Sequence, residues 1–243
     1  MTEIQHLLSD YKNKHEGEDI YVLASGKSYD YYPSTFFDNR VTIGVNQMSQ
    51  LRPCTYAVRK EIAPGCIDTA LNGFLANVLF LSVGTGGDAG TANQQLMEQP
   101  EHNHLLSTGR VVLFNHAKNV RIVPNRLPTD PNTLVVSWST VTTAIHLAAH
   151  MGARAVYLVG HDCGTLDGEL NCTGYHTIQT LRPKWGAGGR RVERYTSWLH
   201  AIEKDTSKLR GLLSDLYGCH VVSLSPFVGL GMEEHTYHKH EPS

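Results

Sequence analysis

The fold is decided by the stretch Ser137-Trp-Ser-Thr-Val-Thr-Thr-Ala-Ile-His-Leu-Ala-Ala-His-Met-Gly-Ala-Arg-Ala-Val-Tyr-Leu-Val-Gly-His-Asp-Cys-Gly164. Hydroxyl side chains from Ser139 onward open an Ala/Leu/Ile-rich segment that Gly152 closes, which is typical of a capped helix. The apolar run Ala155–Val159 follows and ends at polar residues, as a buried strand does. In an open α/β sheet the carboxyl ends of the strands and the N-termini of the adjoining helices line the ligand crevice, where free backbone N–H groups and the helix dipole favour anions. The stretch therefore predicts a phosphate-bearing ligand.

Length and composition limit the class of protein. A chain of 243 residues fits one nucleotide-binding α/β domain over residues 1–243. A net charge of -2 does not indicate nucleic acid or an anionic membrane as a partner of the whole surface. Five scattered cysteines without a C-x-x-C pair favour reduced thiols and a cytoplasmic location. No secretory signal or membrane span is expected from the apolar runs, and an oligomer is left open.

The rest of the chain alternates between strand-like and helix-like patterns. This alternation predicts a Rossmann-like three-layer α/β fold with a mainly parallel sheet. The glycine-rich residues 84–90 and the polar segment after them are expected to form a mobile excursion, and residues 164–189 a flexible lid. Helices are expected over residues 3–14 and 190–217, and strands over residues 20–24, 40–45, 55–58, 78–83, 110–114, 120–123 and 220–224.

Polar residues follow the first two expected strands. Asn46 and Gln47 carry paired donor and acceptor groups that suit a base or ribose edge. The first strand is followed by a small-residue turn in which glycine allows close approach to a ligand. This turn lacks the Walker spacing, so by itself it is compatible with an ordinary turn. Its members are Ser25, Gly26, Lys27 and Ser28.

Several motifs occur in the order seen in a known family. The chain resembles bacterial sialyltransferases of glycosyltransferase family 42 and the related Rossmann-like group that includes archaeal 6-hydroxymethyl-pterin pyrophosphokinases. It departs from that pattern at Ala24 and Lys27, where the family turn usually has glycine and proline, and at Val141, where the family helix start has glycine. The residues that carry the resemblance are Ala24 to Ser28, Val45 to Gln47, Ser139, Thr140, Gly160, His161, Asp162 and Leu224 to Pro226.

The resemblance implies a set of roles. A nucleotide would lie between the turn of residues 25–28, Asn46 and the helix start at Ser139 and Thr140, with Gly160, Gln47 and Ser225 nearby. In that family tyrosines steady the leaving phosphate and a histidine deprotonates the acceptor hydroxyl. Tyr175 and His176 stand at the matching place.

Alternatives to this catalytic assignment come from the residues themselves. His161 and Asp162 form a rival pair at the strand end, and a structural role for Asp162 at the crevice is equally compatible. His146 and His150 have the i, i+4 spacing of zinc ligands but lack the glutamate between them, so a polar helix stripe explains them more simply. The chain contains no D-x-D, which favours a metal-independent transfer without a required cofactor.

One stretch of the chain concentrates positive charge beside aromatic residues. A solvated helix face is the default interpretation, but aromatic and basic side chains together also hold flipped bases. An acceptor hydroxyl on a saccharide or on a hydroxymethylated base in DNA is compatible with this stretch. The residues considered for acceptor or phosphate binding are Arg182, Lys184, Arg190 and Arg191.

The sequence therefore predicts a glycosyltransferase that uses a nucleotide-sugar donor and a hydroxyl acceptor. A pyrophosphokinase is the first alternative, and it would use ATP with Mg²⁺ (or Mn²⁺) held by residues such as Asp162 or Asp167. A non-catalytic nucleotide or nucleic-acid binding module is the second.

Overall fold

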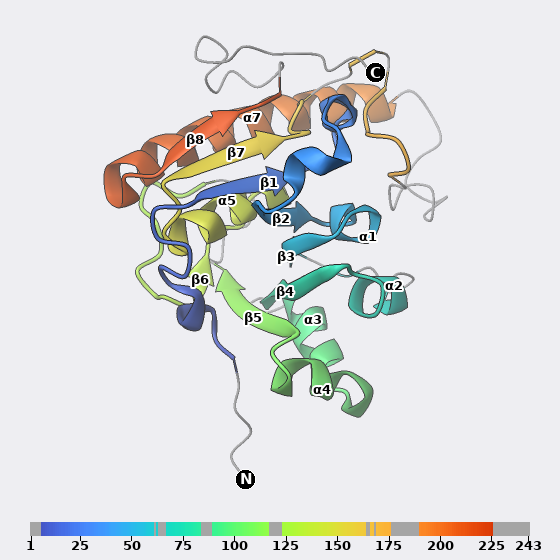
Figure 1. Cartoon of the computed structure of the whole chain (residues 1–243), viewed down its shortest axis with the longest axis vertical. Helices are drawn as coiled ribbons and strands as arrows, with labels where there is room; N and C mark the ends of the chain where they lie inside the picture. The colour runs from blue at the N-terminus through green and yellow to red at the C-terminus, as the bar shows by residue number, and fades with distance from the viewer. Residues whose placement is uncertain are drawn as a thin grey trace.

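A parallel β-sheet forms the centre of the computed structural model, which describes residues 6–60, 62, 67–83, 89–116, 123–163, 166–167, 169–175 and 190–225. Within these ranges eight strands pair in the order β6-β5-β4-β3-β2-β1-β7-β8, and every pair is parallel. The prediction of a Rossmann-like α/β fold with a mainly parallel sheet is confirmed (Figure 1). The strands are β1 Asp19–Leu23, β2 Val41–Val45, β3 Cys54–Arg59, β4 Ala76–Val83, β5 Val111–His116, β6 Thr133–Leu134, β7 Ala155–Val159 and β8 His220–Ser223.

The strand order places a topological switch beside β1. From β1 the chain moves outward through β2 to β6 and then returns to place β7 on the other side of β1. At such a switch the connections leave the sheet in opposite directions, which opens a crevice outside the carboxyl ends of the two strands. A ligand crevice is therefore expected at the carboxyl ends of β1 and β7.

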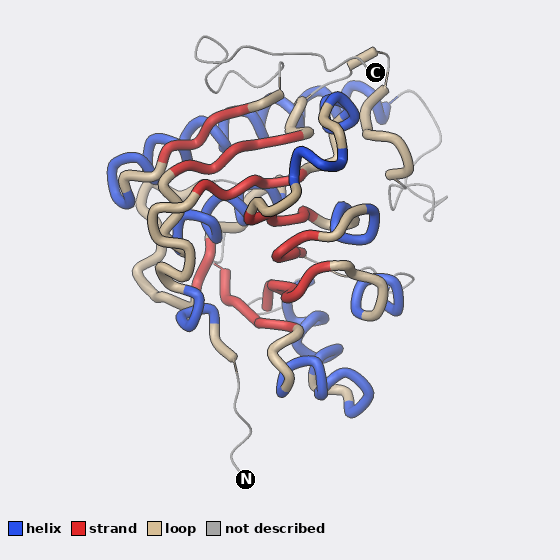
Figure 2. The backbone as a smooth tube through the Cα atoms, viewed as in Figure 1, coloured by secondary structure: helices blue, strands red, loops and turns tan. Residues whose placement is uncertain are grey.

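Helices cover both faces of the sheet (Figure 2). Alternate residues of β3 show the division, because Tyr56 and Val58 belong to one hydrophobic core and Ala57 to the other. The first core contains α5 and α7, and the second contains α1, α2, α3 and α4. The helices are α1 Met48–Leu51, α2 Ile67–Leu71, α3 Ala89–Met97, α4 Pro100–Ser107, α5 Thr140–His150 and α7 Arg190–Tyr217, with 3₁₀ helices η1 Leu8–Tyr11, η2 Lys27–Tyr31 and η3 Ser34–Phe37.

Helix α5 is the central helix of the fold. All eleven of its residues are buried, because it lies against β1, β2, β3 and β7 on one side and against α7 on another. A helix enclosed in this way needs small and apolar side chains on nearly every face, which the Ala/Leu/Ile-rich sequence supplies. The pattern that predicts this helix and the following β7 is confirmed at both elements.

The two histidines of α5 are structural parts of the core. His146 accepts a hydrogen bond at Nδ1 from the Val135 N–H (2.9 Å), and His150 donates from Nε2 to the Leu8 carbonyl (3.2 Å). The rings therefore bind different partners and share no ligand position, which supports the structural interpretation over a zinc pair. Burial lowers the pKa of both, that of His146 to about 3.

Two elements expected from the sequence, an N-terminal helix and an edge strand, differ from those in the structure. Of the helix expected over residues 3–14, residues 3–5 lie outside the described ranges, and the rest forms only the 3₁₀ helix η1. The backbone of Lys12 is extended and that of Asn13 is left-handed (φ 57°), so the helix cannot continue. The strand expected over residues 120–123 is wrong at Val123, which lies outside the sheet, while residues 120–122 lie outside the described ranges. The edge position belongs instead to the two-residue β6.

The segment after residue 88 is not the expected excursion. It forms α3 and α4, of which α3 packs beside β4 and α4 beside β5. Polar side chains dominate the segment, but Leu96, Met97 and Leu105 supply the buried contacts. Pro100 occupies the first turn of α4, where its missing N–H costs nothing. Buried apolar residues, together with the buried Asn93, which bonds to Lys60, Ile62 and Ser82, thus attach a helical pair whose sequence is mostly polar.

Burial of neutral His146 predicts acid sensitivity. The unfolded histidine binds a proton below pH about 6.5 and the folded one does not until about pH 3, so stability falls as the pH drops between these values. At pH 5 the loss from this residue is about 2 kcal/mol relative to pH 7.5. His146→Gln should remove about that amount from the decrease, as measured by urea denaturation at both pH values.

The matched control for this experiment is His104→Gln, at an exposed histidine of α4. The control variant should show the wild-type decrease. A wild-type-sized decrease in His146→Gln would contradict the account.

Candidate functional site

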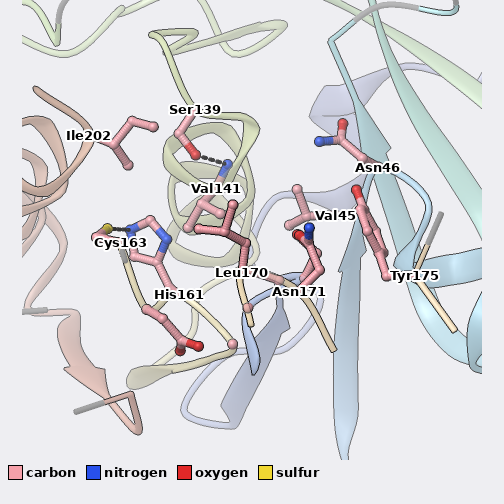
Figure 3. A pocket seen from close by; sticks show the side chains of 15 residues that line it. Val45, Asn46, Ser139, Val141, His161, Cys163, Leu170, Asn171, Tyr175 and Ile202 are labelled. Atoms are coloured by element: carbon pink, nitrogen blue, oxygen red, sulfur yellow. Dashed lines mark hydrogen bonds between the residues drawn. The ribbon is translucent and has the colours of Figure 1, made fainter. Parts of the chain in front are cut away.

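A pocket opens at the carboxyl edge of the sheet, at the topological switch. It is formed by the residues that follow β1, β2 and β7, by the start of α5, by residues 170–175 and by Ile202 of α7 (Figure 3). The cavity between these residues has a volume of about 130 Å³. The structure therefore brings together segments that are up to 178 positions apart in the sequence, from Ala24 to Ile202.

The floor of the pocket is a backbone contact between two turns. The Ala24 N–H donates to the Val159 carbonyl (2.8 Å), and the Gly26 N–H donates to the Gly160 carbonyl (2.7 Å). A Cβ on Gly26 would lie 2.4 Å from the Gly160 oxygen, and one on Gly160, where φ is 71°, would lie 2.3 Å from the Ala24 oxygen. Only glycine fits at either position, so these two residues keep β1 and β7 in contact beyond the sheet.

Asp162 locks the same junction from within. Its side chain accepts hydrogen bonds from the Ser28 N–H (2.8 Å) and the Ser28 hydroxyl, and Ser28 Oγ lies 3.1 Å from Ser225 Oγ. The His161 N–H donates to Ser225 Oγ (2.9 Å). Burial raises the pKa of Asp162, whereas the bonds from Ser28 act in the opposite direction. Asp162 is 2% exposed and holds the ends of β1, β7 and β8 together.

The opposite wall carries the amide side chains. Asn46 follows β2 in the left-handed conformation (φ 55°), which asparagine tolerates better than most residues, and its N–H donates to the Val58 carbonyl (3.0 Å). This backbone geometry turns the side-chain amide toward the pocket (Figure 3). Gln47 accepts a hydrogen bond at Oε1 from the Tyr175 hydroxyl (2.8 Å), so Gln47 contacts the loop that bears the tyrosine.

The N-terminus of α5 forms a third wall. Ser139 caps the helix by accepting a hydrogen bond at Oγ from the Val141 N–H (3.1 Å), and both residues line the pocket. In the described ranges no residue accepts the Thr140 N–H. The positive end of the helix dipole thus faces the pocket mouth, where it favours an anionic group.

A loop that precedes Tyr175 is fastened to η2. The Cys172 N–H donates to the Ser25 carbonyl (2.8 Å), and Thr173 donates from its N–H and hydroxyl to Asp30. Asp30 also forms an ion pair with Lys27 (2.9 Å), so the Lys27 ammonium supports the loop and is not free in the pocket. These bonds place Tyr175 at the pocket wall.

Most of the residues expected in the catalytic loop and the basic stretch lie outside the described ranges. His176, Arg182, Lys184 and most of the expected lid lie outside the described residues, as do the side chains of Arg190 and Arg191. The backbone of α7 runs over the range expected for that helix. Asp167, considered for magnesium, accepts a hydrogen bond from the Tyr31 hydroxyl.

Four lining residues were missed by sequence reasoning. Leu170 and Asn171 reach the pocket from the loop, Cys163 from the turn after β7, and Ile202 from α7 (Figure 3). Burial raises the pKa of the Cys163 thiol to about 12, so it stays protonated at neutral pH. The sequence holds one indication that Cys163 lines the pocket, because it directly follows Gly160-His-Asp. Ile202 has only the helical spacing of an ordinary core residue.

The described part of the chain contains no group of three histidine, cysteine, aspartate or glutamate side chains placed to hold a metal ion. No described helix is both long and apolar enough to cross a membrane.

Comparisons with known proteins give structural likenesses at low sequence identity. The fold is similar to the Campylobacter jejuni sialyltransferase CstII, solved with a trisaccharide acceptor and CMP (12% identity, TM-score 0.44, covering 93% of this chain and 89% of that one). It is also similar to the α-2,3-sialyltransferase Cst-I of Campylobacter jejuni (15%, TM-score 0.44, covering 93% and 82%). The MAf glycosyltransferase of Magnetospirillum magneticum AMB-1 is a third (15%, TM-score 0.39, covering 85% and 41%).

The sequence comparisons give no relative. No protein-family model matches the chain, and no curated protein matches it significantly in sequence.

The glycine junction gives a test of the site's architecture. Gly26→Ala and Gly160→Ala should each lower the free energy of unfolding by roughly 2 kcal/mol or more, because the new Cβ meets backbone oxygens that cannot move aside. Gly211→Ala is the control, since it lies in α7 with no atom within 4 Å of its Cβ position and should stabilise by about 1 kcal/mol. Chemical denaturation of the three variants decides, and equal effects at all three would refute the junction.

Proposed function

We propose that this chain is a nucleotide-binding transferase whose substrate pocket lies at the carboxyl edge of the sheet. The observation that carries the proposal is the arrangement of Ser139 and Asn46 on facing walls of one pocket, with the N-terminus of α5 on the first wall (Figure 3). A helix N-terminus suits a phosphate, and an asparagine amide suits a base or ribose edge. A nucleotide carries both groups, a phosphate and a nucleoside.

Within this class we propose a glycosyltransferase. It would move a sugar from a nucleotide-sugar donor to a hydroxyl acceptor, which is a saccharide or a hydroxymethylated base in DNA. The motif resemblance at Ala24 to Ser28, Ser139 to Asp162 and Ser225 supports this choice. The absence of D-x-D from the sequence supports a transfer in which protein groups neutralise the leaving phosphate.

The site suggests a division of labour among its residues. The start of α5 would hold the donor phosphate and Asn46 the nucleoside. Tyr175 would turn its hydroxyl from Gln47 Oε1 to the phosphate oxygen as that oxygen departs. His176 directly follows Tyr175, and as a general base it would remove the acceptor proton. Asp162, Ser28 and Ser225 are engaged with each other, so we assign them to building the pocket.

The pyrophosphokinase alternative is less compatible with these contacts. Magnesium bound to ATP needs carboxylate oxygens that face the phosphates. The Asp162 carboxylate is buried and accepts hydrogen bonds from Ser28, and the Asp167 carboxylate accepts one from the Tyr31 hydroxyl. The glycosyltransferase is therefore the function we favour, and a transferase activity that survives EDTA would separate the two.

Nucleotide binding is the first test of the proposal. In a thermal-shift screen of CMP, UDP, GDP, ATP and their sugar conjugates, at least one should raise the melting temperature, because a ligand bound only by the folded state stabilises it. Asn46→Ala and Ser139→Ala should reduce that shift, since each removes a bonding group already used in the ground state.

Exposed positions provide the controls for these variants. Asn77→Ala in β4 and Ser207→Ala in α7 lie outside the pocket and should retain the full shift. No shift with any nucleotide would sink the proposed function, and binding without turnover would favour a non-catalytic module.

Catalysis by the loop gives a second test. His176→Ala should lower kcat by about a hundred- to ten-thousand-fold while donor Kd barely changes, because a general base acts in the transition state. The measurement is kcat and donor Kd on the same preparations. Near-wild-type turnover in His176→Ala, together with inactive His161→Ala, would move the base to the strand end.

A further inference from the structure

His161 lies at the pocket with its two ring nitrogens in different surroundings. The ring is 5% exposed and belongs to the turn that follows β7. Its Nε2 is directed toward α7, where Thr206 Oγ1 lies 3.0 Å away, and Cys163 Sγ lies 3.8 Å from the same nitrogen (Figure 3). The other ring nitrogen, Nδ1, faces the interior of the pocket (Figure 3).

The position of the ring proton follows from the bonding of Thr206. A hydroxyl has a single hydrogen, and that of Thr206 is donated to the Ile202 carbonyl (2.9 Å). With its hydrogen on the Ile202 carbonyl, Thr206 Oγ1 is an acceptor for His161, and this arrangement favours the tautomer with the proton on Nε2. In a neutral ring Nδ1 is then a bare lone pair, and no described residue donates to it.

We propose that His161 Nδ1 is a specificity-determining acceptor that takes a hydrogen bond from a hydroxyl or amino group of the bound nucleotide. The inference rests on the proposed function, because it requires a nucleotide in this pocket. It adds a recognition contact on the β7 side that complements the amide of Asn46 on the β2 side. Thr206 becomes the residue that fixes the tautomer.

Recognition suits this ring better than proton transfer does. Burial lowers the pKa of His161 to about 4, so the ring stays neutral at physiological pH. A base this weak removes a proton from a sugar hydroxyl poorly, and a neutral ring supplies no positive charge to a phosphate. A fixed lone pair on a buried ring discriminates well, because a ligand that lacks the donor leaves the acceptor unbonded.

The donor group could come from the ribose or from the base. Ribose offers its 2′ and 3′ hydroxyls, whereas cytosine, adenine and guanine offer an exocyclic amine that uracil lacks. Comparison of CMP with UMP, and of CMP with its 2′-deoxy and 3′-deoxy forms, assigns the source.

The tautomer is tested first, on the uniformly ¹⁵N-labelled full chain. Long-range ¹H–¹⁵N correlation spectra at pH 7 should show His161 neutral with its proton on Nε2. Thr206→Val removes the acceptor and should shift His161 toward a mixture of tautomers. A proton on Nδ1, or an imidazolium, in the wild-type chain would overturn the proposal.

Ligand recognition is tested by calorimetry on His161→Phe, which keeps a ring without the acceptor. This variant should bind CMP about three- to tenfold more weakly than wild type, while the analogue that lacks the recognised donor should bind both equally. His220→Phe, at an exposed histidine at the start of β8, should bind like wild type. If His161→Phe does not fold, Thr206→Val takes its place and should weaken the same ligand selectively.

The outcomes distinguish a failure of the His161 recognition role from a failure of the proposed nucleotide-binding function. Nucleotides that bind wild type and His161→Phe with the same affinity overturn the recognition role alone. A uniform loss with every analogue also overturns it, because it would reveal a purely structural ring. A wild-type chain that binds no nucleotide overturns the proposed function and the recognition role together.

Discussion

The contact between Gly26 and Gly160 is the constraint on which the site depends. It brings the turns after β1 and β7 within hydrogen-bond distance, and Asp162 then reaches Ser28 across the same junction. A carboxylate buried this deeply is stable only when its oxygens accept hydrogen bonds, which the N–H and hydroxyl of Ser28 supply. The junction is thus a rigid floor, and the walls of the pocket are arranged around it.

Helix α5 adds a positively polarised helix N-terminus to this floor. Its complete burial fixes the helix against four strands, and this places the capped N-terminus at the pocket mouth. The facing wall depends on Asn46, whose left-handed backbone aims the amide at the same space. Strained backbone of this kind persists where the surrounding structure holds it, and here it is held by the bond from Asn46 to Val58.

Local patterns predicted the elements that form by local rules. The helix and strand of residues 140–159 followed from periodicity and capping, and α7 has the expected bounds. The pair α3 and α4 was missed, because Leu96, Met97 and Leu105 stabilise it through tertiary contacts that a polar sequence hides. Strand-end residues were placed at the site, but their partners were not, since Asp162 meets Ser28 across 134 positions.

A crystal structure of the chain with a bound nucleoside monophosphate tests the central claim most directly. The account predicts the phosphate at the Thr140 N–H at the start of α5, at about 3 Å, with the nucleoside beside Asn46 and His161. Density for the nucleotide at the amino ends of the strands, for instance in the groove near Arg154 and His220, would contradict it. So would a phosphate on the far side of the pocket from Ser139.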